Sequence, residues 1–288
     1  MKIACLILAH KDPQQVKKLI QLLSDEQIYF FIHLDKKTNI IPFQHELSND
    51  KITFIKNRVR TNRGELSLVQ ATINSLEEIT KKDSYDYINF ISGQDLPLIS
   101  GRQFVEFLSI NKGTEFICAK PYDATDIWWK KNEPRLFEYN LQNWKIPGKY
   151  TIQKIINAIL PKRMFPDGYT LTGNSQWFCI TTTCAKYILK STHKNSPIVN
   201  YFNYVWGADE FFFSTIVYNS SFKENIKDNL HFVKWDNEID GHPETLEEKD
   251  FKEIIISEKI FARKFDEAHD EKIIRLIEQR IEENKTIK

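Results

Sequence analysis

The chain has 288 residues, and its 40 lysines and arginines against 39 aspartates and glutamates give a net charge of +1. This balance argues against a protein that coats nucleic acid, because such a protein needs a broad positive field. Hydrophobic residues make up 41% of the chain and aromatic residues 13%, which excludes a disordered polypeptide.

The first half of the chain alternates strand and helix signals. Residues 3–8 form a continuous apolar run typical of a buried parallel strand, and the Asp12-Pro13 pair then predicts the start of a helix. A helix with an apolar stripe is predicted between 66 and 79, and further strands at 28–34, 52–55 and 87–91. This alternation predicts an α/β fold with a central, mostly parallel sheet flanked by helices.

Polar residues follow three of these predicted strands. His10, Asp35 and the Gly93-Gln94-Asp95 turn come directly after them. Because ligands bind beyond the carboxyl ends of strands in such sheets, we expect these residues to share one rim. A cap or a turn is the favoured explanation for any one of them alone, whereas the three together favour a binding site.

The rest of the chain is expected to continue the same domain after a long insertion. Residues 120–170 form this insertion between halves at 1–119 and 171–288, and they combine tryptophans, prolines and charges without a period. Residues 128–149 are the candidate for membrane contact, although an ordinary folded insertion is favoured. Helices are predicted at 183–189, at 209–218 and from 267 onward, and strands at 176–180, 230–236 and 260–266.

Several cofactor and membrane signals are missing. The four cysteines form no CxxC pair and no histidine cluster lies near them, so neither a zinc site nor a disulfide framework is expected. No GxGxxG, Walker A or GxSxG motif is present, and a DxD triplet for a divalent ion is absent. Any bound diphosphate must then be neutralised by lysine or arginine. No apolar run approaches the roughly 20 residues that span a bilayer, so a soluble protein is expected.

Two pairs of charged residues could carry chemistry. Asp209 and Glu210 precede a run of phenylalanines, and apolar surroundings would raise the pKa of Glu210 toward that of a useful base. Complementing a helix dipole explains the acidic pair equally well. At residues 260–266, strand alternation sends Arg263 and Lys264 to opposite faces, so that one cation enters a cleft. A surface basic pair is the alternative.

Seven stretches of the chain resemble motifs of the core-2/I-branching β-1,6-N-acetylglucosaminyltransferases, which are grouped with the peptide O-xylosyltransferases. The stretches occur in the family's order and span nearly the whole chain. They are residues 6–11, 31–35, 85–97, 173–178, 208–211, 232–235 and 261–266. The resemblance implies a GT-A-like nucleotide-sugar-binding fold. It also implies an inverting, metal-independent transfer of a sugar, expected to be N-acetylglucosamine, from a UDP-sugar to a hydroxyl of a glycan or glycolipid. Xylosyl transfer and a non-catalytic sugar-binding protein of the same fold are the alternatives.

The resemblance implies roles for single residues. Glu210 matches the glutamate that deprotonates the acceptor hydroxyl, and Lys264 matches the lysine that contacts the diphosphate. Asp35 matches the aspartate at the uridine site, and Trp235 matches an aromatic residue of the acceptor cleft. His10 is also expected near the nucleotide. The residues expected around the donor and acceptor sugars are Gln94, Asp95, Gln176, Trp177 and Asp209.

The chain departs from the family in three ways. The branching enzymes carry a second diphosphate cation, an arginine, where residues 241–246 have none. Arg63, Arg263 or His242 is expected to replace it, with Arg63 favoured. The xylosyltransferases carry an acid where this chain has Gln176, and an amide cannot act as a base. The membrane anchor and paired cysteines of the animal relatives are not seen either, so we expect a bacterial-type cytoplasmic enzyme, at the inner face of the membrane if its acceptor is a glycolipid.

Overall fold

A computed structural model describes residues 1–192, 196–235 and 243–286. Its centre is a seven-stranded sheet with the order β3-β2-β1-β4-β7-β6-β8. The strands are β1 (Ile3–Ala9), β2 (Ile28–Leu34), β3 (Ile52–Phe54), β4 (Tyr87–Ser92), β6 (Glu115–Pro121), β7 (Thr172–Thr181) and β8 (Ile226–Lys227). β7 runs antiparallel to both of its neighbours, and the other strands share one direction. The predicted α/β fold with a mostly parallel sheet is therefore confirmed.

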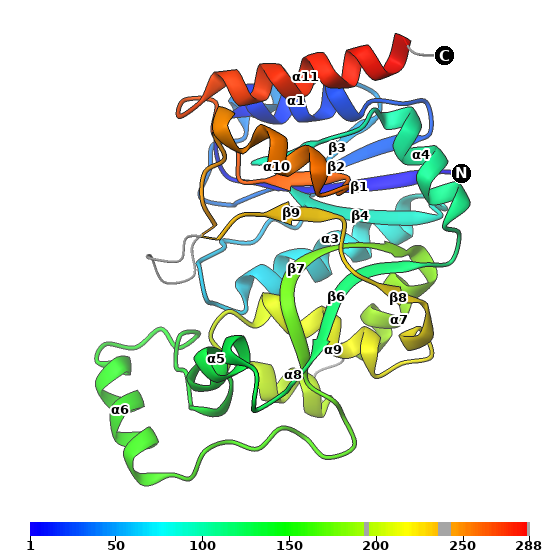
Figure 1. The fold of residues 1–288 in the computed structure, drawn as a ribbon. Helices are drawn as coiled ribbons and strands as arrows, with labels where there is room; N and C mark the ends of the chain where they lie inside the picture. The colour runs from blue at the N-terminus through cyan, green and yellow to red at the C-terminus, as the bar shows by residue number, and fades with distance from the viewer. Residues whose placement is uncertain (193–195, 236–242, 287–288) are drawn as a thin grey trace.

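Helices cover both faces of this sheet (Figure 1). One face packs against α1 (Pro13–Leu23), α2 (Ile41–Glu46), α4 (Gly101–Ile110), α10 (Phe251–Ile256) and α11 (Glu271–Thr286). The other packs against α3 (Ser67–Lys82), α5 (Ile127–Phe137), α7 (Thr182–Ser191), α8 (Pro197–Phe202) and α9 (Phe212–Tyr218). In β1, Cys5 and Ile7 point into the first core, while Ala4 and Leu6 point into the second. Burial on both faces is why this strand reads as a continuous apolar run.

Local capping residues set several helix starts. The Asp12 side chain accepts a hydrogen bond from the Gln15 amide, and Pro13 occupies the first turn of α1 as predicted. Ser100 and Gln103 form a capping box at the start of α4, a helix that the sequence analysis did not predict. The predicted 209–218 helix is two elements, a 3-10 turn (Ala208–Glu210) followed by α9. Further 3-10 turns are Lys223–Asn225 and Glu248–Asp250.

A second, three-stranded sheet contributes Leu96, Phe261 and Ala262 to the first core. Its central strand β10 (Phe261–Arg263) runs antiparallel to β5 (Asp95–Pro97) and parallel to β9 (His231–Val233). The predicted strands at 230–236 and 260–266 are therefore present but shorter. The backbone N–H of Phe265 donates to the carbonyl of Gln94, so the segment after β10 is attached to the turn after β4. In this way the C-terminal part of the chain reaches the carboxyl ends of the central strands.

The segment between β6 and β7 contains α5 and α6 (Lys149–Ile159). Helix α5 packs into the second core through Trp129 and Leu136. Helix α6 stands away from both sheets, at the edge of the molecule (Figure 1). No helix in the described part of the chain is long and apolar enough to cross a membrane.

Candidate active site

A cleft of about 430 Å³ opens at the carboxyl ends of β1 and β4. An adjoining cavity of about 150 Å³ shares part of its lining and extends to Lys11 and Thr61. Ten of the residues predicted for the site line the cleft: His10, Arg63, Gln94, Gln176, Trp177, Asp209, Glu210, Trp235, Arg263 and Lys264. Of the polar residues expected to share this rim of the sheet, His10 and Gln94 line the cleft, whereas Asp35 and Asp95 do not.

The topology of the two sheets explains how distant segments meet here. Phe178 of β7 pairs with Phe90 of β4, and the two strands run in opposite directions. The preceding residues of β7, Gln176 and Trp177, therefore lie beside the end of β4, where Gln94 follows. The small sheet adds Arg263 and Lys264 from near the end of the chain. Residues that are far apart in the sequence are therefore brought together in one compact site.

Asp35 and Asp95 do not line the cleft, in contrast to the expectation that they contact ligand. Asp35 is buried and accepts hydrogen bonds from the Lys37 amide, at 2.7 Å, and from the amide and hydroxyl of Thr61. Although burial would raise it, these hydrogen bonds hold the pKa of Asp35 below its usual value. Because Thr61 lines the adjoining cavity, Asp35 holds one residue of that cavity in place through hydrogen bonds and does not line the cavity itself.

Asp95 is fully buried behind the cationic wall of the cleft. Its carboxylate lies 3.3 Å from Arg263 Nε and 3.3 Å from His231 Nε2. The register of β10 against β5 places Arg263 directly opposite Asp95, which accounts for the first contact. The Arg263 guanidinium also lies 4.4 Å from the centre of the Trp177 ring. Asp95 and Trp177 therefore hold Arg263 in position, and the expected sugar contact of Asp95 is wrong.

Lys264 lines the same cleft as Arg263, so the prediction that they point to opposite faces is wrong. The reason is that β10 ends at Arg263 and strand alternation does not extend to the next residue. Burial lowers the pKa of Lys264, and the charges of Lys11 and Arg263 lower it further. Arg63 acts in the same direction. A lysine surrounded by other cations is typical of a site that binds an anion.

The cleft also carries the acidic pair, Asp209 and Glu210. Burial raises the pKa of Asp209 to about 7, and the neighbouring Glu210 carboxylate contributes to the increase. Glu210 itself forms an ion pair with Arg135, with Oε2 2.7 Å from the Arg135 guanidinium. The apolar surroundings predicted for Glu210 are therefore wrong, because a guanidinium lies against its carboxylate.

Arg135 lies in α5 of the insertion, and the sequence analysis missed it. Its guanidinium donates to the carbonyl of Trp206, to the side chain of Asn132 and to Glu210. It also lies 4.7 Å from the centre of the Trp206 ring. Gly207 leaves room for it, since a Cβ there would come within 2.2 Å of the guanidinium. Nothing local in the sequence links Arg135 to an acid 75 residues away.

Aromatic side chains form the outer part of the cleft. Trp235 is 46% exposed and bridges through its backbone to Pro243, while Trp206 lies against Gly64 and Arg63. An exposed indole at the mouth of a polar cleft is suited to packing against a sugar ring. His242, one of the expected second cations, lies outside the described residues.

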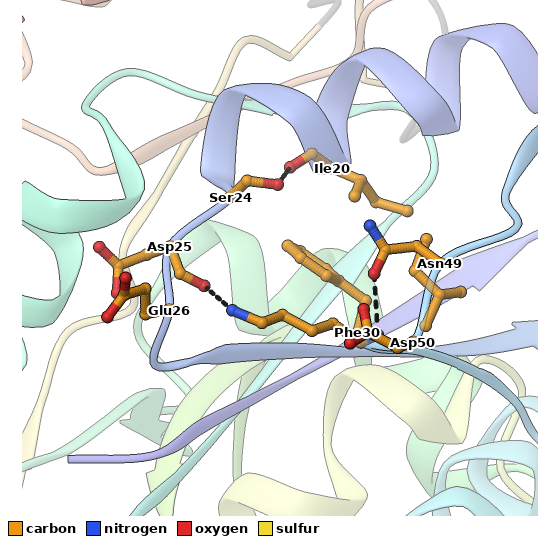
Figure 2. Close-up of a pocket in the computed structure, with 9 residues that line it drawn as sticks. Ile20, Ser24, Asp25, Glu26, Phe30, Asn49 and Asp50 are labelled. Atoms are coloured by element: carbon orange, nitrogen blue, oxygen red, sulfur yellow. Dashed lines mark hydrogen bonds between the residues drawn. The ribbon is translucent and has the colours of Figure 1, made fainter.

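Another cavity of about 320 Å³ lies at the opposite edge of the sheet, between the end of α1 and the starts of β2 and β3 (Figure 2). Its polar groups bond to one another: Lys51 donates to the carbonyl of Asp25, and the Ser24 hydroxyl donates to that of Ile20. Ligands of such sheets bind at the carboxyl ends of the strands, so this cavity is a poor candidate. Among the described residues, no three histidine, cysteine or acidic side chains gather closely enough to hold a metal ion.

Known proteins resemble this chain in sequence more clearly than in structure. A family model described as "Core-2/I-Branching enzyme" matches residues 3–259. Xylosyltransferase 2 of Canis lupus familiaris is 23% identical over 96% of this chain and 33% of its own length. Xylosyltransferase 1 of Rattus norvegicus is 23% identical over 83% of the chain and 28% of its own length. The chain thus spans about a third of the length of these relatives.

Solved structures give weaker matches. The 1–349 fragment of S. aureus TarS in complex with UDP is 11% identical with a TM-score of 0.38, covering 97% of this chain and 65% of its own. Glucosyl-3-phosphoglycerate synthase from Mycobacterium tuberculosis, in complex with Mn²⁺, UDP and glucosyl-3-phosphoglycerate, is 12% identical with a TM-score of 0.33, covering 64% and 57%. These scores are too low to support any inference about the site.

Proposed function

Because the chain belongs to the Core-2/I-branching enzyme family, we propose that it is a glycosyltransferase that moves a sugar from a UDP-sugar to a hydroxyl of a glycan or glycolipid. The supporting observation is one cleft whose lining combines the cations of Arg263 and Lys264 with the carboxylate of Glu210. A diphosphate leaving group needs the cations, and an acceptor hydroxyl needs the base. A sugar-binding protein without activity would not need both.

In the proposed reaction the acceptor oxygen attacks the anomeric carbon of the donor. Glu210 takes the hydroxyl proton as the new C–O bond forms, and the bond from the sugar to UDP breaks. A single in-line displacement inverts the configuration, so one carboxylate is enough. The Arg135 hydrogen bond fixes the direction of the Glu210 carboxylate.

Lys264 is proposed to stabilise the negative charge that develops on departing UDP. Arg263 lies beside Lys264, and the Asp95 carboxylate already balances its positive charge. We propose Arg63 as the second diphosphate cation, since it lines the same cleft and its charge is felt at Lys264. With these residues the transfer is proposed to need no metal ion.

The donor sugar is proposed to be N-acetylglucosamine, and xylose is the second candidate because xylosyltransferases are among the relatives. The two donors differ in ring substituents, and competition calorimetry with both UDP-sugars would separate them. The ring is expected to lie near Gln94, Gln176 and Trp177, with Trp235 toward the acceptor.

The proposal is tested by UDP release from a panel of UDP-sugars and acceptors, with and without EDTA. Glu210→Gln should abolish turnover and keep UDP binding. Lys264→Met should weaken UDP binding, whereas the control Lys272→Met, at an exposed side chain of α11, should not. Full activity of Glu210→Gln would remove this residue as the base, and complete loss of activity with EDTA would refute metal independence.

A further inference from the structure

Helix α6 is attached to the rest of the protein by hydrogen bonds of two polar side chains. The Gln153 side chain accepts a hydrogen bond from the Leu141 amide, and Asn157 bonds to both the amide and the carbonyl of Tyr139. Ile155 and Ile159, four residues apart and so on one face, are 54% and 75% exposed. No residue of α6 is buried. The helix is thus held by Gln153 and Asn157, with Ile152 and Ile156 half-buried beside them, and it exposes Ile155 and Ile159.

The segments on either side of α6 also carry exposed apolar side chains. Trp144 and Ile146 precede the helix and are exposed, as are Leu160 and Met164 after it. We call residues 144–164 the α6 face. Figure 1 shows that its helix stands clear of both sheets. Such a concentration of exposed apolar side chains in one segment is typical of a site of interaction.

The charge of the region is entirely positive. Residues 139–166 contain no aspartate or glutamate, and they contain Lys145, Lys149, Lys154, Lys162 and Arg163. Of the chain's net charge of +1, this stretch contributes +5 and the remainder therefore −4. Arg163 is used internally, because it donates to the carbonyls of Leu136, Tyr201 and Tyr204. Lys145, Lys154 and Lys162 are exposed in the same stretch of chain.

We propose that the α6 face docks on an anionic lipid bilayer. Exposed apolar side chains interspersed with lysines match both parts of such a surface, its acyl boundary and its negative headgroups. A second copy of the chain fits less well, since a symmetric contact would set the same lysines against one another.

The α6 face begins beside the cleft. Asn143 accepts a hydrogen bond from the Leu66 amide and donates to the carbonyl of Asn203, and Arg63 and Gly64 of the cleft lie just before Leu66 in the chain. Docking would therefore hold the cleft close to the bilayer. A cleft held at the bilayer favours a lipid-linked acceptor, an inference that rests on the proposed transferase function.

Vesicle binding tests the docking without any measurement of turnover. The full chain is sedimented with vesicles of phosphatidylcholine and about one third phosphatidylglycerol, and with phosphatidylcholine alone. We expect binding to the anionic vesicles that weakens at high salt. The variant Ile155→Ser/Ile159→Ser should lose at least about tenfold in affinity. The matched control Ile110→Ser/Ile256→Ser, at positions 85% and 79% exposed on α4 and α10, should bind as the wild type does.

A charge variant examines the electrostatic part separately. Lys154→Gln/Lys162→Gln should weaken binding about fivefold per lysine. Far-UV circular dichroism confirms that each variant is folded, which is expected because every substituted side chain is exposed. The proposal is overturned if the wild-type chain stays in the supernatant, or if the isoleucine variant binds like the control. It is also overturned if light scattering shows a dimer that this variant dissociates while no vesicles are bound.

Discussion

Replacing the buried Asp95 by asparagine should destabilise the protein by about 3 kcal/mol. Removing one partner from a buried ion pair costs roughly 3–5 kcal/mol, because the remaining charge stays desolvated. We take the lower end since neither Arg263 Nε nor His231 Nε2 has hydrogen-bond geometry toward the carboxylate, although both lie 3.3 Å away. Asparagine keeps the shape and can keep both contacts with Ser92, whose hydroxyl can accept as well as donate.

Urea unfolding at pH 7 measures this loss. With a slope of about 3 kcal/mol per M, the midpoint of Asp95→Asn should fall by roughly 1 M. The control is Asp83→Asn, which breaks an exposed ion pair with Lys2 of 2.8 Å. Exposed pairs contribute less than about 1 kcal/mol, so this variant should unfold close to the wild type. A loss below about 1 kcal/mol for Asp95→Asn would refute the reasoning.

The same pair predicts a pH dependence. Although burial would raise it, the Arg263 charge and then His231 hold the pKa of Asp95 below its usual value. An acid with a depressed folded-state pKa stabilises the fold above its unfolded pKa near 4, and this contribution is lost as the pH falls through the folded value. The difference in stability between the wild type and Asp95→Asn should therefore shrink below about pH 4.

Three further predictions concern the acidic pair Asp209 and Glu210 and the residues packed against it. Arg135→Gln should lower kcat about 10- to 100-fold without changing the dissociation constant of UDP, because a charge-assisted hydrogen bond of about 1.5–3 kcal/mol orients Glu210. Steady-state kinetics measure kcat and calorimetry measures UDP binding. An equal loss of UDP affinity would contradict this prediction. The buried Asp209 binds its proton more tightly in the folded state, so the stability of the wild type should fall as the pH rises from about 4 to about 7. Asp209→Asn should lack this pH dependence in thermal melts. An unchanged pH dependence would assign the effect to another group. Gly173→Ala should cost about 1–3 kcal/mol, since its Cβ would lie 2.2 Å from the Phe211 ring; an unchanged melting temperature would show that the ring can move.

The strands and the location of the site followed from local patterns. A strand buried on both faces is apolar at most positions, so β1, β2 and β4 could be identified from the chain alone. The polar residues after them had to lie at one edge, because parallel strands end on the same side. Short elements such as β5 and β8, with three and two residues, contain no full period and were missed.

The support behind the site could not be read from the sequence. Arg263 and Lys264 were expected to diverge by alternation, but β10 ends between them, and only pairing with β5 and β9 sets that end. Likewise, the resemblance gave Glu210 its expected role but could not show what surrounds it. A carboxylate's surroundings depend on whichever segments the fold brings to it.

The amino-acid sequence by itself determined the α/β class, the rim that carries the cleft and the residue types that line it, because periodicity and strand ends are local properties of a chain. Tertiary structure decided which groups act together. Arg135 meets Glu210 from 75 residues away, and Asp95 is buried opposite Arg263 and not exposed to ligand. These pairings are long-range contacts, and their strength depends on burial and distance, which a sequence does not contain.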